Sequence, residues 1–572
     1  MRLQLAGTGA SPGHALGRAR IRQPHILEVD KERISAAGVP EELQRLHRAL
    51  RAAREEMRDL RKRLQGALAE EAGEFIELHA LLLDDPELLH NLDSLIREEH
   101  YSADYALRVQ RDRLATVFGR MEDDYLKSRL DDLDHIIGRI HAHLHEREAT
   151  LLGAAGDILI GDAIAPSELA QLQAQGVIAV VTATGSALSH SAILARSLHL
   201  PLIIGATHAL QKINDGDVLI VDAETGHVIL NPSAEDLRGH RARLKQSARE
   251  RRELERLRGK PSRTLDGADI TLYANAESNE DVIRAHALGA TGIGLYRTEF
   301  LFLGQDRLPD EEEQFRVYRN IVLSMDGRPV TIRTLDLGSD KGHEGLTPRD
   351  EDNPALGLRG IRLSLAHPAH FDVQLRAIAR ASAYGRVRIL IPMISRREEL
   401  LSVRRRLRKV SEQLRAEGHQ VAESIPLGTM IEVPAVAIAV QSLMDVVDFL
   451  SIGTNDLVQY LLAADRCNEA LDDLYSPLHP GVLQLLNHVI ETSAHNGKPV
   501  AICGEIAGDP WLTRMLLALG LTEFSLHPNS LLEVRRIIRN SDLGLLRAAS
   551  PKLLQARDRA GIQRWLAATG QA

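Results

Sequence analysis

Residues 185–205 read GSALSHSAILARSLHLPLIIG, a helix signal followed by a strand signal. Ser189 can cap a helix whose first turn holds His190, and the apolar residues behind it recur at helical spacing. Pro201 cannot continue that helix, and the apolar run 200–205 predicts a short buried strand. A short helix leading into a buried strand indicates an α/β unit around this stretch.

The predicted position of His190 favours a bound anion. Backbone N–H groups and the helix dipole at a helix start stabilise negative charge, so a phosphate carried on the ring would be stabilised there. An imidazole with a pKa near ~6.5 is largely neutral at neutral pH and can act as a nucleophile. From these residues alone a second interpretation stays open, in which His190 is a surface histidine that caps a helix.

The sequence on either side supplies the remaining strands of this unit. Apolar runs predict strands near residues 157–162, 177–183, 200–206, 217–223 and 227–232. Short apolar runs within the first 25 residues predict further strands, which we expect at the edge of a small α/β unit. Residues 1–28 and 148–231 are therefore predicted to have α/β structure.

Residues 29–147 change to a helical pattern that is dense in Leu, Arg and Glu. Apolar residues recur at intervals of three and four residues, which predicts antiparallel helices packed as a bundle. Acidic side chains that could dock a basic protein, or could simply form a solvated helix face, cluster at Glu70, Glu71, Glu74, Glu77, Asp84, Asp85 and Glu87. Residues 232–260 predict a charged linker helix.

Residues 261–572 alternate between strand-like runs and helical stretches. The runs that predict strands lie at 270–275, 292–297, 330–336, 388–393, 428–432, 449–454, 501–505 and 523–527. Eight such βα units in about 300 residues predict a TIM (β/α)8 barrel. The whole chain is thus predicted to be multidomain, combining α/β with all-α structure.

Bulk composition narrows the class of protein. A net charge of −9 and an aromatic content of 3% argue against a nucleic-acid binder. Two cysteines in 572 residues favour a reducing compartment. No run of 18 apolar residues could span a membrane and no signal peptide is apparent, so we expect a cytoplasmic protein without membrane insertion.

Polar side chains follow the predicted barrel strands, where a TIM barrel builds its active site. These candidate residues are Arg297, Arg333, Glu432, Asn455, Asp456, Arg466 and Cys503. Several arginines suit a small substrate with a phosphate and a carboxylate, and neighbouring carboxylates suit Mg²⁺. Cys503 could be a general acid, because a thiol with pKa near ~8.5 stays mostly protonated, or a small buried hydrophobe.

Long motifs in every region resemble Enzyme I of the bacterial sugar phosphotransferase system. They include SHSAILARSLHLP at 189–201, GIGLYRTEFLFL at 292–303, SIGTNDLVQY at 451–460 and CGEIAGD at 503–509. The resemblance covers essentially the whole chain. It implies a swivelling phosphohistidine domain with an inserted helical domain, a linker helix, and a phosphoenolpyruvate-binding barrel that forms a homodimer.

The resemblance also implies roles for individual residues. Phosphoenolpyruvate would phosphorylate His190 on Nε2, and the phosphate would pass to the histidine-containing phosphocarrier protein docked on residues 29–147. The residues that would hold the substrate are Arg297, Arg333, Asn455, Asp456 and Arg466, with Arg359 and Lys341 as supporting cations. Glu432 and Asp456 would bind Mg²⁺, and Cys503 would protonate the enolate carbon to release pyruvate.

Three positions near His190 depart from the family pattern. Ser186 and Leu188 stand where the family usually has a glycine and a threonine. Leu169 stands where the family often has a threonine. Two other classes of protein share parts of this pattern: a swivelling dikinase or synthase that uses phosphoenolpyruvate, and a non-enzymatic regulator with the same fold. The first would need an ATP-grasp domain, for which residues 29–147 offer no strands or Gly-rich loop.

Overall fold

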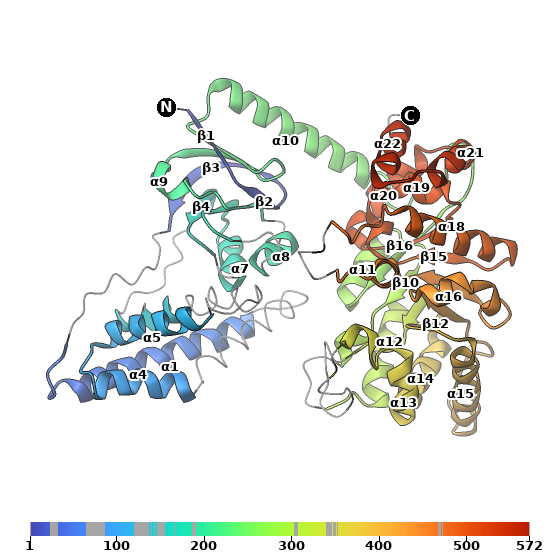
Figure 1. The fold of residues 1–572 in the computed structure, drawn as a ribbon, viewed down its shortest axis with the longest axis horizontal. Helices are drawn as coiled ribbons and strands as arrows, with labels where there is room; N and C mark the ends of the chain where they lie inside the picture. Colours follow the sequence, from blue (N-terminus) through green and yellow to red (C-terminus); the bar gives the residue numbers. More distant parts are fainter. Residues whose placement is uncertain are drawn as a thin grey trace. The chain divides into compact units, whose positions relative to one another are not determined.

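The computed structural model forms two compact units, residues 1–249 and residues 250–572 (Figure 1). It describes residues 2–22, 33–63, 86–118, 136–138, 140–141, 143–145, 155–164, 166–185, 190–198, 200–302, 307–338, 346, 351, 353–466, 471 and 473–570. In this part of the chain no helix is both long enough and apolar enough to cross a membrane.

The first unit contains an eight-stranded sheet with the order β1-β8-β7-β3-β4-β5-β6-β2. Its strands are β1 Leu3–Ala6, β2 Thr8–Ser11, β3 His14–Ile21, β4 Asp157–Gly161, β5 Ala179–Thr182, β6 Leu202–Ile204, β7 Val218–Asp222 and β8 His227–Leu230. All five strands predicted between residues 157 and 232 are confirmed.

The N-terminal strands occupy both the edges and the centre of this sheet. β1 and β2 are edge strands, as expected. For β3 the expectation was wrong, because it lies between β4 and β7 and pairs with both. The physical reason is that β3 is long enough to pair with both β4 and β7. Its small residues Ala15 and Ala19 are buried in the core of the domain.

Helices α7 Pro166–Ala174, α8 His190–Ser197 and α9 Ala209–Lys212 belong to the same domain. The predicted helix is confirmed, and it begins at His190. Leu169 of α7 is fully buried in an apolar cluster with Ala192 and Leu194 of α8. The leucine that departs from the family pattern is therefore a packing residue between two helices. Ser186 and Leu188 lie outside the described residues.

The predicted helical region is confirmed where it is described. Its helices are α1 Val39–Arg63, α4 Pro86–Arg97 and α5 Ala103–Phe118, and a further helical stretch covers 136–138, 140–141 and 143–144. Buried leucines and isoleucines from all four stretches form one core. The acidic residues from Glu70 to Asp85, and the side chain of Glu87, lie outside the described part.

The predicted linker helix is also confirmed, as α10 Ala234–Glu255. It carries many charges and buries only His240. The division between the two compact units falls within this helix, between residues 249 and 250.

The second unit is a closed barrel of eight parallel strands, β9 to β16 in chain order. They are β9 Thr271–Ala276, β10 Ile293–Tyr296, β11 Val330–Arg333, β12 Val387–Ile391, β13 Leu427–Ile431, β14 Phe449–Ile452, β15 Val500–Ile502 and β16 Glu523–Leu526. Each of the eight predicted strands is present, so the TIM-barrel prediction is confirmed. The barrel closes where β16 pairs with β9 from Glu523–Thr271 to Leu526–Ala274, and the register shifts within β10, on both of its sides.

Helices surround the barrel (Figure 1). They are α11 Asn279–Ala287, α12 Glu311–Ser324, α13 Ile361–Ala366, α14 Pro368–Ala381, α15 Arg397–Ala416, α16 Pro434–Ile438, α17 Thr454–Leu462, α18 Pro480–His495, α19 Thr513–Ala518, α20 Leu531–Arg539, α21 Leu543–Leu554 and α22 Arg559–Gly570. Because all strands are parallel, the side chains that follow them emerge at one end of the barrel.

Candidate active site

The predicted site residues of the barrel stand at its carboxyl end. Arg333 is the last residue of β11, while Arg297, Glu432 and Cys503 directly follow β10, β13 and β15. Asn455 and Asp456 lie in the first turn of α17, after β14. The polar positions inferred from the sequence therefore do come from adjacent strand ends.

Three buried carboxylates form the centre of the site. One oxygen from each of Asp336, Glu432 and Asp456 lies within 4.8 Å of the others. Glu432 is 1% exposed, and the other two side chains are also buried. Asp336 was missed by the sequence reasoning, although it follows Arg333 by three residues at the same strand end and could have been found by that position.

Burial raises the pKa of Glu432 to about 8, and repulsion from Asp336 and Asp456 adds to this effect. Arg333 and the backbone N–H of Met393 act in the opposite direction. The N–H of Met393 donates to Oε1 of Glu432 over 2.5 Å. The carboxylates thus have an unbalanced negative charge, which a proton or a cation would relieve.

The donor set fits Mg²⁺. Carboxylate oxygens are the hard ligands that this ion takes, commonly through one or two carboxylates together with substrate oxygens. The backbone packs closely against the Glu432 carboxylate, since a Cβ at Gly453 would stand 2.8 Å from its Oε2. The predicted ligands Glu432 and Asp456 are therefore gathered with Asp336 in one confined place.

Two arginines pair with this carboxylate cluster. Arg333 contacts Asp336 (Nη1–Oδ2, 3.0 Å) and Glu299 (Nη2–Oε1, 3.1 Å). Arg359 contacts Asp336 at 3.2 Å and Asp456 at 3.4 Å. Burial lowers the pKa of both guanidinium groups, but the surrounding carboxylates outweigh it and raise the pKa overall. Both arginines therefore stay charged.

A cavity of about 660 Å³ opens beside this network. Among its lining residues are Arg297, Asn455 and Cys503. Arg297 is 38% exposed and pairs with Glu277, and Asn455 exchanges hydrogen bonds of 3.1 and 3.0 Å with Glu505. The cavity is large enough for a small organic phosphate and presents a cation, an amide and a thiol to it.

Cys503 combines both interpretations that the sequence left open. It packs in a buried cluster with Leu295, Leu390, Met430 and Phe449, and it also lines the cavity. Burial raises the pKa of its thiol, and the charge of Glu432 adds to the rise. The thiol therefore stays protonated at neutral pH and holds a proton that it can donate.

Of the remaining three predicted residues, only Arg466 has a described side chain. Arg466 reaches Asp456 only at 3.9 Å and is 38% exposed. Lys341 lies outside the described residues. The backbone of His190 starts α8 in the other unit, and its side chain is not among those described.

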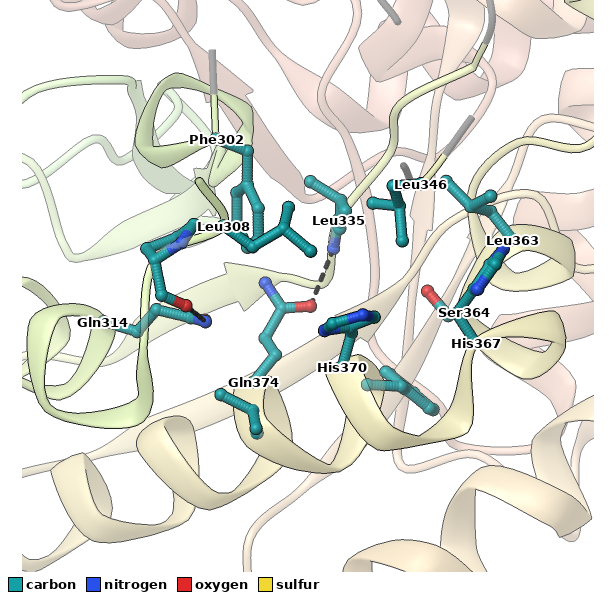
Figure 2. Close-up of a pocket in the computed structure, with 13 residues that line it drawn as sticks. Phe302, Leu308, Gln314, Leu335, Leu346, Leu363, Ser364, His367, His370 and Gln374 are labelled. Atoms are coloured by element: carbon teal, nitrogen blue, oxygen red, sulfur yellow. Dashed lines mark hydrogen bonds between the residues drawn. The ribbon is translucent and has the colours of Figure 1, made fainter. Parts of the chain in front are cut away.

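A second, much smaller cavity of about 30 Å³ shows how the strand end of β11 is held (Figure 2). Gln374 of α14 accepts a 3.0 Å hydrogen bond from the N–H of Leu335. Its amide nitrogen donates to Thr298 and Tyr318, both at 3.3 Å. Because Leu335 lies between Arg333 and Asp336, this buried glutamine fixes the backbone that carries both site residues.

Family models of known proteins match three segments of this chain. Residues 6–129, 153–226 and 251–543 match the family models for the N-terminal, mobile and phosphoenolpyruvate-binding domains of PEP-utilising enzymes. The fold and the site thus define an enzyme that uses phosphoenolpyruvate.

Relatives narrow the class further. The chain is 41% identical to the phosphoenolpyruvate-protein phosphotransferase of Cupriavidus necator, over 98% of each chain. It is 37% identical to that of Staphylococcus carnosus, over 97% of each. A solution structure titled Enzyme I is 29% identical and matches 43% of this chain and 99% of its own, with a TM-score of 0.36. The chain belongs to the Enzyme I family, the phosphoenolpyruvate–protein phosphotransferases of the phosphotransferase system.

Proposed function

We propose that this chain moves the phosphoryl group of phosphoenolpyruvate to Nε2 of His190 and then to a histidine-containing phosphocarrier protein. The observation that carries the proposal is the convergence of three carboxylates, two buried arginines and a protonated thiol at one end of the barrel. The position of His190 at the start of α8 supports its role as acceptor, because a helix start stabilises phosphate.

The chemistry follows from the charges at the barrel mouth. The imidazole nitrogen attacks phosphorus, the P–O bond to the enol oxygen breaks, and the P–N bond forms. The electron pair left on the enolate is taken up when its carbon removes the proton from the Cys503 thiol, which yields pyruvate. Arg297, Arg333 and Asn455 would orient the phosphate and the carboxylate of the substrate through charge-assisted hydrogen bonds.

Arg359, Arg466 and Lys341 are proposed as supporting cations. Glu432 and Asp456, with Asp336 beside them, would hold Mg²⁺, which neutralises phosphoryl charge when it is bound. The acceptor and the barrel site belong to different compact units, so the proposal requires His190 to approach the barrel mouth and to leave it again.

The partner proposals come from family membership. The phosphocarrier would dock on the helical domain, and the chain would form a homodimer through its barrel and act in the cytoplasm in sugar uptake or its regulation. Sedimentation of the full chain tests the dimer. Binding of a purified phosphocarrier tests the docking surface. It is compared between the wild-type chain and variants in which charged residues within 29–147 are replaced.

Incubation with Mg²⁺ and phosphate-labelled phosphoenolpyruvate tests the central step. We expect acid-labile label on the wild type and on His208→Ala, which alters an exposed histidine of the same domain. We expect no label on His190→Ala. Label on His190→Ala would identify another acceptor and refute the proposal, and an unlabelled wild type would favour the non-enzymatic regulator.

A further inference from the structure

The helical region gathers a second set of side chains whose types can bind a metal ion, separate from the barrel site. Asp104, His141 and His145 each place one ligand atom within 4.8 Å of the other two. Both histidines direct Nε2 to the same oxygen, Oδ1 of Asp104, at 3.4 Å from His141 and 2.9 Å from His145. We propose that these three residues bind a divalent transition-metal ion, with Zn²⁺ as the preferred ion.

The spacing matches first-row metal coordination. Zn²⁺ takes nitrogen and carboxylate oxygen ligands at about 2.0–2.2 Å, so neighbouring tetrahedral ligands stand roughly 3.3 Å apart. The two nitrogen–oxygen distances bracket that value. His141 and His145 are four residues apart in a helical stretch, which puts them on one face with ring centroids 4.6 Å apart.

The surroundings hold the carboxylate in position for this role. Arg45 of α1 donates to the other oxygen of Asp104 at 3.1 Å, and it also donates to the carbonyl of Leu144 at 3.2 Å. Such outer partners orient a ligand and are typical of metal sites. The positive charge of Arg45 does not cancel the attraction of Asp104 for a cation, because the carboxylate of Glu42 pairs with Arg45 at 3.1 Å and offsets its charge.

Access and ligand type also favour a metal ion. Asp104 is buried, whereas the His141 side chain is 23% and the His145 side chain 40% exposed, so an ion can enter from solvent and keep water as a fourth ligand. Imidazole nitrogen suits Zn²⁺, while Mg²⁺ prefers oxygen. A bound ion would join α5 to the helical stretch that carries His141 and His145.

The test is a Zn²⁺ titration of the full chain in millimolar Mg²⁺, read by competition with a chromophoric chelator and repeated with Co²⁺ by visible absorption. We expect His141→Gln and His145→Gln each to weaken binding at least about tenfold, since losing even an outer-shell partner costs about 10–100-fold. His143→Gln, in the same stretch, should bind like the wild type.

Circular dichroism without metal verifies that the variants fold. Equal Zn²⁺ affinity of all four proteins, or a Co²⁺ spectrum that His141→Gln and His145→Gln leave unchanged, would overturn the proposal. The two histidines would then be only hydrogen-bond partners of Asp104. Because none of these residues takes part in the proposed phosphoryl transfer, either outcome leaves that proposal standing.

Discussion

The backbone N–H of Met393 donates to the carboxylate of Glu432 from a left-handed conformation, with a φ of 56° at Met393. Such a conformation costs a non-glycine residue on the order of 1–3 kcal/mol and persists only where its surroundings enforce it. At Met393 this conformation directs the backbone N–H toward the buried carboxyl group of Glu432. The bond favours the ionised carboxylate, but burial and two neighbouring carboxylates prevail and raise the pKa of Glu432.

Glu432→Gln should make the metal-free protein less sensitive to pH. The pKa of Glu432 is about 8 in the fold against an ordinary 4.5. Between these values the folded chain keeps a proton that the unfolded chain has lost, so its stability falls as pH rises through this window. Thermal unfolding in a chelator should show a weaker decline for Glu432→Gln than for wild type. Exposed Glu412→Gln is the control, and equal slopes in all three proteins would contradict the assignment.

The need for Mg²⁺ should increase as pH falls. A proton on Glu432 competes with the ion, so below a pH of about 8 the Mg²⁺ concentration that gives half-maximal pyruvate formation should rise by up to about tenfold per pH unit. Mg²⁺ titrations at several pH values with saturating phosphoenolpyruvate measure this. A requirement that does not change with pH would show that Glu432 is already ionised in the working enzyme.

Asp336→Asn should impair the site through both of its partners. The carboxylate contacts Arg333 at 3.0 Å and Arg359 at 3.2 Å, and removing a buried partner typically costs about 3–5 kcal/mol. Its charge also raises the pKa of Glu432, so the Mg²⁺ profile should move to lower pH. A merely destabilised barrel would not show that movement.

Asp372→Asn is the matched control for this change. Asp372 pairs with Arg406 at 2.9 Å, but both side chains are about one-third exposed and lie away from the strand ends. Exposed pairs contribute about 0–1 kcal/mol, so stability and the Mg²⁺ profile should stay close to wild type. An equal effect of the two substitutions would remove Asp336 from the proposed site.

The strands could be predicted where apolar runs end at polar or turn residues, as all eight barrel strands do. β2, with the sequence TGAS, carries no apolar run, so only its pairing with β6 defines it. The central place of β3 depends on strands more than 130 residues away, which local patterning cannot indicate. Pairing between distant segments, rather than propensity, decided these two elements.

The site was predictable to the extent that side chains directly follow strands. Asp336 was missed although it ends the predicted run 330–336, and its contact with Arg359 beside Asp456 shows that it belongs to the site. The role of Gln374 could not be predicted either, since it lies in the middle of α14 and acts through the backbone of Leu335. Contacts between distant residues cannot be read from spacing.

Gly360→Ala should destabilise the barrel more than backbone strain alone explains. Gly360 has a φ of 57°, and a Cβ there would stand 2.8 Å from the Met393 side chain and 3.1 Å from Oδ1 of Asp336. Gly418 also has a positive φ, but a Cβ would meet nothing within 4 Å. Denaturant unfolding should show a loss of about 1 kcal/mol for Gly418→Ala and a larger loss, with reduced activity, for Gly360→Ala. Equal losses would mean that the site tolerates the extra methyl group.

Cys503→Ala should slow turnover by about 10²–10⁴-fold, the usual contribution of a general acid. Burial raises the pKa of this thiol, so it carries a proton throughout the neutral range, and alanine removes that proton while filling most of the same apolar space. A coupled assay for pyruvate measures the loss. Cys467→Ala, at the other cysteine of the chain, should keep wild-type turnover. Normal pyruvate formation by Cys503→Ala would instead assign the proton to water in the adjoining cavity, and the thiol would then serve only to pack the strand ends.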